Sequence, residues 1–279
     1  MKLSLHTLAG LLVGCAVSGA ALAQDKAPLI NPTGAGATAP ANAPAAGPLT
    51  ADASVDQVLD ALDVRGRNLE QFVADVTLTE VDEATQLESQ RTGRVWYQKR
   101  AGNDRIRVTF DKKAQGKFDR DERLEYLLDG GWLVDRDYRR SIEVKRQVLR
   151  PGEKINLLKL GEGPFPLPIG QPKEDVLKQF EVSKGDPALG GPKGAPHVAL
   201  KPREGTRLAR KFAQIDVWVD PQTQMPVRID ALDANETTRR TTELRNVRVN
   251  PNPALGERDF ALPKIDENKW ELHAEPYED

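Results

Sequence analysis

The sequence of 279 residues has only one cysteine and three histidines, which limits the chemistry open to it. Cys15 and His6 lie within the first 23 residues, so His197 and His273 are the only histidines in the rest of the chain. The sequence has no zinc-type Cys/His spacing, no nucleophile elbow and no Walker loop. A lone histidine is more often structural than catalytic. The inventory therefore argues against an enzyme and predicts no metal site and no cofactor.

An excess of positive charge is also missing. The chain has 40 basic and 42 acidic residues and a formal net charge of -2. Phosphate backbones are bound by concentrated positive charge, so no nucleic-acid partner is expected. One local basic patch is conceivable, but interleaved acidic residues favour a solvated strand face instead. The patch would comprise Arg105, Arg107, Arg139, Arg140, Lys145 and Arg146.

No hydrophobic run is long enough to span a bilayer comfortably. The apolar stretch at residues 8–22 follows Lys2 and ends in Ala21-Leu22-Ala23, which has the A-x-A form of a signal-peptidase site. These features predict a signal peptide over residues 1–23 and a periplasmic protein. A lipoprotein box ending at Cys15 is the alternative, in which case a lipid on that cysteine would anchor the chain to a membrane.

Composition divides the remaining chain into three parts. Residues 24–53 are rich in Ala, Pro and Gly and predict a disordered linker, because such a segment buries too little apolar surface to fold. Residues 54–265 carry the periodic patterns of a folded domain. Residues 266–279 are expected to form a polar tail.

Period-two alternation dominates residues 91–149. Apolar side chains at every second position predict strands with one apolar and one charged face. The apolar positions include Val95, Tyr97, Ile106, Val108, Phe110, Leu124, Tyr126, Leu128, Ile142 and Val144. Residues 111–122 are almost entirely polar and predict an exposed loop.

Other segments add helices and further strands. A capping box at Ser54 and Gln57 predicts a helix that begins there, and Pro172 suits the start of a second helix. Strands resume near His197, and residues 220–224 form a turn between two alternating runs. No βαβ alternation is present, so an antiparallel α+β fold is expected. Such a sheet needs cover on its apolar face, and the helices either fill that space or leave a cavity.

The order of short motifs resembles the bacterial lipoprotein carriers LolA and LolB and their wider superfamily. The similarity covers residues 54–263, and three sets of residues carry it. The first strand motif is Gly93-Arg94-Val95-Trp96, followed by Lys99-Arg100. A hairpin motif follows at Asp129-Gly130-Gly131-Trp132. The C-terminal part has Trp218-Val219-Asp220-Pro221, Asn246 to Asn250, and Phe260-Ala261-Leu262-Pro263.

The resemblance implies an unclosed antiparallel β-barrel, or half-barrel, with helices over an apolar concave face. It also implies a hydrophobic cavity that takes acyl chains, with a lid. The predicted cavity residues are Val76, Leu78, Val95, Tyr97, Ile106, Val108, Phe110, Tyr126, Leu128, Val217 and Val219. The predicted lid residues are Leu158, Phe165 and Arg100. In the carriers, an arginine that helps to hold the lid closed is followed by a proline. Here Arg100 is the nearest match, and Ala101 follows it.

The resemblance implies a periplasmic carrier that moves acylated lipoproteins or lipids toward the outer membrane as a monomer. An inner- or outer-membrane protein would act as its partner. A second hypothesis is an envelope-stress sensor of the same fold, which would bind lipid or peptide and signal to a membrane partner.

Overall fold

A computed structural model describes residues 47–101, 104–116, 118–150, 153 and 171–277. The chain divides into two units, Met1–Ala45 and Ala46–Asp279, and the described residues all belong to the second. The predicted leader with Cys15 and most of the predicted linker therefore lie outside the described residues. The proposed limits of the linker, domain and tail stay predictions.

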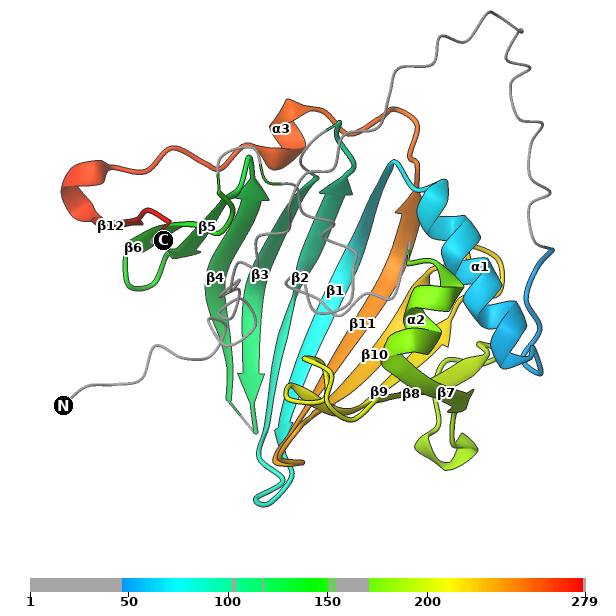
Figure 1. The fold of residues 1–279 in the computed structure, drawn as a ribbon. Coiled ribbons are helices and arrows are strands. Elements are labelled where there is room, and N and C mark those ends of the chain that lie inside the picture. Colours follow the sequence, from blue (N-terminus) through cyan, green and yellow to red (C-terminus); the bar gives the residue numbers. More distant parts are fainter. Residues whose placement is uncertain (1–46, 102–103, 117, 151–152, 154–170, 278–279) are drawn as a thin grey trace, which may run out of the picture. The chain divides into compact units, whose positions relative to one another are not determined.

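Twelve strands of the described residues form one sheet (Figure 1). In chain order the first six are β1 (Gln71–Asp82), β2 (Glu88–Gln98), β3 (Arg105–Gln115), β4 (Phe118–Asp129), β5 (Trp132–Asp137) and β6 (Ile142–Gln147). The others are β7 (Phe180–Lys184), β8 (His197–Pro202), β9 (Phe212–Val219), β10 (Pro226–Asp233), β11 (Thr238–Val249) and β12 (Glu271–Glu275).

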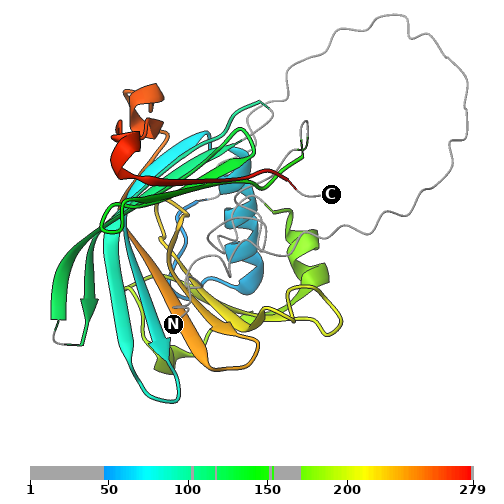
Figure 2. The ribbon, with the colours of Figure 1, turned by 90° about the vertical axis from the view of Figure 1, so that its left-hand side faces the viewer.

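The strand order is β12-β6-β5-β4-β3-β2-β1-β11-β10-β9-β8-β7. All neighbours pair antiparallel except β12, which runs parallel to β6. The order ends at β12 and β7, so the sheet is not closed. The sheet curves around helix α1 (Val55–Arg67), which lies inside the curve in Figure 2. This arrangement confirms the predicted antiparallel α+β half-barrel.

Helix α1 begins with the predicted capping box. The Ser54 hydroxyl accepts a hydrogen bond from the Gln57 backbone N–H at 3.2 Å, and the Gln57 side chain accepts one from the Ser54 N–H at 2.8 Å. Helix α2 (Lys173–Gln179) starts directly after Pro172, as predicted. Both helices pack against each other and against β7. Lys173 Nζ strengthens the helix pair by contacting Asp56 at 2.8 Å.

The C-terminal segment crosses the convex face of the sheet. Its helix α3 (Glu257–Phe260) is held by the buried side chain of Arg105, which donates to both Glu257 carboxylate oxygens and lies 3.9 Å from the centre of the Phe260 ring. Farther along, the ring of Trp270 packs edge-on against Tyr138. Arg105 pairs with Gln98 and alternates with Ile106, so it points away from the concave face. Helix α1 lies inside the curve of the sheet and α3 lies outside it (Figure 2).

Beneath this segment lies a fully buried carboxylate, Glu125. Its oxygens accept hydrogen bonds from Arg107 at 3.1 Å, Arg123 at 3.0 Å and the Tyr138 hydroxyl at 2.6 Å. Burial alone raises the pKa of Glu125, but the hydrogen bonds and the two guanidinium charges outweigh burial and hold the pKa below its usual range.

Two sequence expectations need correction. Residues 111–122 do not form a loop, because residues 111–115 complete β3 and residues 118–122 begin β4. Residues 271–275, in the segment predicted as a polar tail, form the edge strand β12. The conceivable basic patch is a set of separate contacts: Arg105, Arg107, Arg140 and Arg146 each pair with a carboxylate, and Lys145 lies over the Trp132 ring.

Backbone geometry explains three glycines of the sequence motifs. A β-carbon on Gly93 would lie 1.7 Å from the carbonyl oxygen of Thr109 on the neighbouring strand, so only glycine fits there. Gly130 and Gly131 join β4 to β5 with φ of 58° and 80°, the positive values that a two-residue hairpin turn requires. None of the helices in the described ranges is long and apolar enough to cross a membrane.

Candidate functional site: the concave face of the sheet

The candidate site is the concave face, and strand register assigns residues to it. Directly paired residues in a sheet point to the same side. One row of pairs runs Ala74, Val95, Val108 and Tyr126, and a second runs Phe72, Tyr97, Ile106 and Leu128. A third row links Leu78 through Thr242 and Ile229 to Val217.

All eleven predicted cavity residues share this face. Nine of them are at most 3% exposed, while Leu78 and Tyr126 are partly exposed. The register brings them together as one apolar wall across β1 to β4 and β9, and their role in ligand binding stays a prediction. Further apolar members of the wall were missed by the sequence: Phe72, Leu124, Val198, Leu200, Ile215, Ile229 and Leu244. The strand pairing places all of them on the same face as the predicted cavity residues.

The described helices cover the part of this wall that lies next to β7. Helix α1 buries a stripe of Val58, Leu59 and Leu62, and α2 buries Val176. Both helices pack toward β7. Leu158 and Phe165, the predicted lid residues, lie outside the described residues.

One end of the wall is fixed by Tyr97. Its ring stacks on Phe72 with 5.5 Å between centroids, and its hydroxyl donates to Asp104 at 2.8 Å. Burial, followed by the negative charge of Asp104, raises the pKa of the Tyr97 phenol. The phenol therefore stays neutral and acts as a hydrogen-bond donor at physiological pH.

Arg100, the third predicted lid residue, lies at the same end. Its guanidinium contacts Asp129 at 3.2 Å, and its backbone N–H donates to Asp104. Within the part of the chain that the structure describes, Arg100 thus links the β2–β3 and β4–β5 turns. A lid function for Arg100 stays a prediction.

The wall becomes polar toward β5. Asp135 pairs with Tyr126 on β4 and Val144 on β6, so its carboxyl group faces the concave side among apolar neighbours. Burial raises the pKa of Asp135 to about 6; the positive charge of Arg146 opposes this shift and the negative charge of Asp137 adds to it. Among described residues Asp135 has no hydrogen-bond partner, and it would change charge near neutral pH.

The end of the concave face that lies away from Tyr97, along the strands, is charged. Arg91, Lys113 and Arg120 are directly paired neighbours on β2, β3 and β4, in the row that contains Leu78. The Glu122 carboxylate accepts hydrogen bonds from Arg91 at 3.0 Å and from Arg120 at 2.9 Å. These four residues are called the basic row below. No sequence pattern indicated the basic row, because two bulges interrupt the alternation there.

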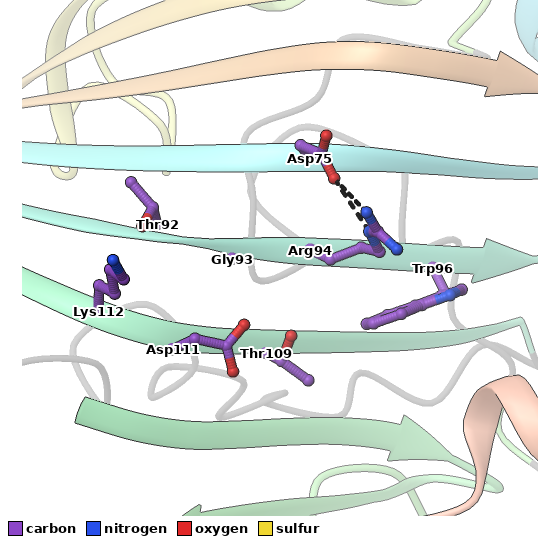
Figure 3. Close-up of a pocket in the computed structure, with 8 residues that line it drawn as sticks. All are labelled: Asp75, Thr92, Gly93, Arg94, Trp96, Thr109, Asp111 and Lys112. Carbon is purple, nitrogen blue, oxygen red and sulfur yellow. Dashed lines mark hydrogen bonds and ion pairs between the residues drawn. The ribbon is translucent and has the colours of Figure 1, made fainter. Parts of the chain in front are cut away.

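The convex face carries two shallow depressions of about 460 Å³ each. One lies over β1, β2 and β3 and is lined by Asp75, Arg94, Trp96, Asp111 and Lys112 (Figure 3). Asp75 and Arg94 form an ion pair across it at 2.9 Å. Its charged lining is unsuited to an acyl chain, which favours the concave face as the candidate site.

His197 has a structural environment on the convex face. Its ring stacks on Trp218 with 3.9 Å between centroids, and its Nε2 lies 2.9 Å from the buried carboxylate of Asp216. The loop at Gly185 and Gly191 packs so closely on these two rings that a β-carbon on either glycine would clash. No group of three potential metal ligands occurs among the described residues.

Comparisons with known proteins give matches in structure only. No family model matches this chain. No curated protein matches it either. Solved structures do match, and one is a LolA superfamily protein. That protein, from Nitrosomonas europaea, is 10% identical, with a TM-score of 0.35, over 75% of this chain and 98% of its own.

Two other matches have different descriptions. An uncharacterized conserved protein from Thermus thermophilus is 14% identical, with a TM-score of 0.43, over 78% of this chain and 98% of its own. The MucA/MucB complex of Pseudomonas aeruginosa gives 13% identity and a TM-score of 0.40, over 74% of this chain and 60% of the matched chain.

Proposed function

We propose that this protein is a periplasmic carrier that binds the acyl chains of lipoproteins or lipids against its concave face. The observation that supports the proposal most is the continuous apolar wall that β1 to β4 and β9 to β11 present on one side of an unclosed sheet. Each buried methylene group contributes about 0.8 kcal/mol, so a chain of a dozen carbons gives strong binding without any polar contact.

The leader and linker fit this function. A signal peptide over residues 1–23 would export the chain, and the linker at residues 24–53 would separate the domain from a lipid on Cys15 if that cysteine is modified. We propose residues 54–265 as the carrier domain. A membrane protein would then deliver or receive the acylated cargo.

A matched pair of substitutions on β1 tests the carrier function. Leu78 and Thr77 are adjacent and both partly exposed, but Leu78 is on the concave face and Thr77 on the convex face. We expect Leu78→Gln to weaken the binding of a fluorescent fatty acid by about tenfold, and Thr77→Gln to leave it unchanged. Equal affinities in all three proteins, or no binding by the parent, would contradict the proposal.

A second candidate is a sensor that binds an extended peptide. It is favoured by β7 and β12, which end the strand order and pair on their outer sides with no other described strand. An edge strand can pair with the backbone of another chain. Fatty acid that fails to bind, together with a peptide that protects β7 or β12 amides from hydrogen exchange, would favour the sensor over the carrier.

A further inference from the structure

The basic row has an arrangement that costs stability without a ligand. Arg91, Lys113 and Arg120 are direct cross-strand neighbours, and like charges in such positions repel. Arg91 is also well buried, with its side chain 11% exposed. Glu122 compensates both arginines, but Lys113 has no hydrogen bond or ion pair with any described residue.

The surrounding charges leave the row positive. Glu80 is the next carboxylate, and it is already paired with Arg240 at 2.9 Å. With Glu80 and Arg240 added, the basic row and its neighbours have four cations and two carboxylates. Burial, followed by the charge of Arg91, lowers the pKa of Lys113, which is the expected effect on an ammonium group that lacks a counter-ion.

The basic row continues the apolar wall. Arg91 is directly opposite Leu78, whose row leads through Thr242 and Ile229 to Val217. Tyr126 also lies close enough to feel the charges of Arg91 and Glu122. A molecule with an apolar chain and an anionic end could thus contact both regions at once.

We propose that Lys113, Arg91 and Arg120 bind the phosphate group of an anionic amphiphile whose acyl chains lie on the apolar wall. Guanidinium and ammonium groups on directly paired positions of neighbouring strands suit an anion with several oxygen acceptors. This site rests on the proposed carrier function and narrows its ligands to amphiphiles with an anionic head.

A lipid is favoured over free phosphate by the neighbouring hairpin tips. The β1–β2 and β3–β4 turns lie at the same end of the sheet (Figure 1). They expose Leu87 and Phe118, whose exposed fractions are 54% and 81%. Apolar side chains at such tips can contact the surface of a bilayer next to the basic row.

Lys112 provides a matched control for Lys113. The two lysines are adjacent on β3, but Lys112 pairs with Thr92 and lines the convex depression in Figure 3. Lys113→Gln and Lys112→Gln therefore make the same chemical change on opposite faces. Arg120→Gln is a second test on the concave face, since Arg120 is 46% exposed and its loss leaves Glu122 bonded to Arg91.

The experiment compares titrations of the full domain with dioctanoyl phosphatidic acid and with dioctanoylglycerol, which has the same chains and no phosphate. We expect phosphatidic acid to bind about tenfold more tightly. Lys113→Gln and Arg120→Gln should remove most of that difference and leave dioctanoylglycerol unaffected, while Lys112→Gln should change neither. Unfolding midpoints close to that of the parent will show that the variants fold.

The contrary outcomes are separable. Equal binding of the two lipids, or an equal effect of Lys112→Gln and Lys113→Gln, overturns the phosphate site and leaves the carrier function standing. Failure of both lipids to bind overturns the carrier function itself. Inorganic phosphate is the third titrant, and binding as tight as that of phosphatidic acid would assign the site to free phosphate instead.

Discussion

Gly93 explains at the level of one residue why a strand motif begins with glycine. The position of its missing β-carbon is taken by the backbone of Thr109, at a bulge between β2 and β3. We predict that Gly93→Ala lowers the free energy of unfolding by about 3 kcal/mol, because a backbone neighbour cannot move aside as a side chain could.

Chemical denaturation measures that effect. Gly47→Ala is the control, since no atom lies within 4 Å of its added β-carbon. It should change stability by less than about 0.5 kcal/mol. Equal stability of Gly93→Ala and Gly47→Ala would contradict the close approach of β2 and β3.

Asp135 predicts a dependence of stability on pH. Its pKa is raised to about 6 in the folded protein, above the ordinary value of 3.8. Between these values the folded state binds more protons than the unfolded state, so the stability contributed by the neutral acid is complete below pH 4 and is lost as pH rises through 6. Asp135→Asn should therefore stabilise the protein by about 2 kcal/mol at pH 7.5 and by almost nothing at pH 4.

Denaturation midpoints at the two pH values test this expectation. Asp121→Asn on the exposed part of β4 is the matched control and should have no such pH dependence. A variant Asp135→Asn that is no more stable than its parent at pH 7.5 would place the carboxyl group in water.

At the level of elements, the sequence predicts strands well wherever only one face is apolar. Val95, Val108 and Tyr126 alternate with polar residues, so both the strands and their inward side could be predicted. Lys113 and Arg120 could not be placed in the same way, because the concave face itself is charged there and the alternation disappears. The basic row joins Arg91 to Glu122 across 31 positions, and only bulged strand pairing brings these residues together.

Strand β12 was missed for a different reason. All five of its residues are exposed, so it carries no apolar pattern. Its parallel pairing with β6 is supported by the ion pair between Arg146 and Glu275. We predict that removing residues 271–279 costs less than about 1 kcal/mol, because exposed ion pairs and edge strands contribute little.

Hydrogen exchange provides the measurement for β12. Its amides should exchange much faster than those of β1, and the truncated protein should keep the exchange pattern of the remaining strands. Global unfolding of the truncated protein would mean that β12 holds the C-terminal segment and the buried Glu125 contacts in place.

At the level of the whole molecule, the two faces of one sheet differ in chemistry. The convex face is closed by buried ion pairs such as Arg107 with Glu125 and by the C-terminal segment. The concave face combines an apolar wall with a charged end. This division follows from strand parity, and it is the basis for proposing a lipid carrier.

Native mass spectrometry of the protein purified from its own periplasm tests this account most directly. The account predicts additional masses that match acylated species and that disappear after extraction with organic solvent. It also predicts that the extracted protein takes up added phosphatidic acid. A protein that carries no acyl species and takes up none would contradict the account, because the concave face would then be only a filled core.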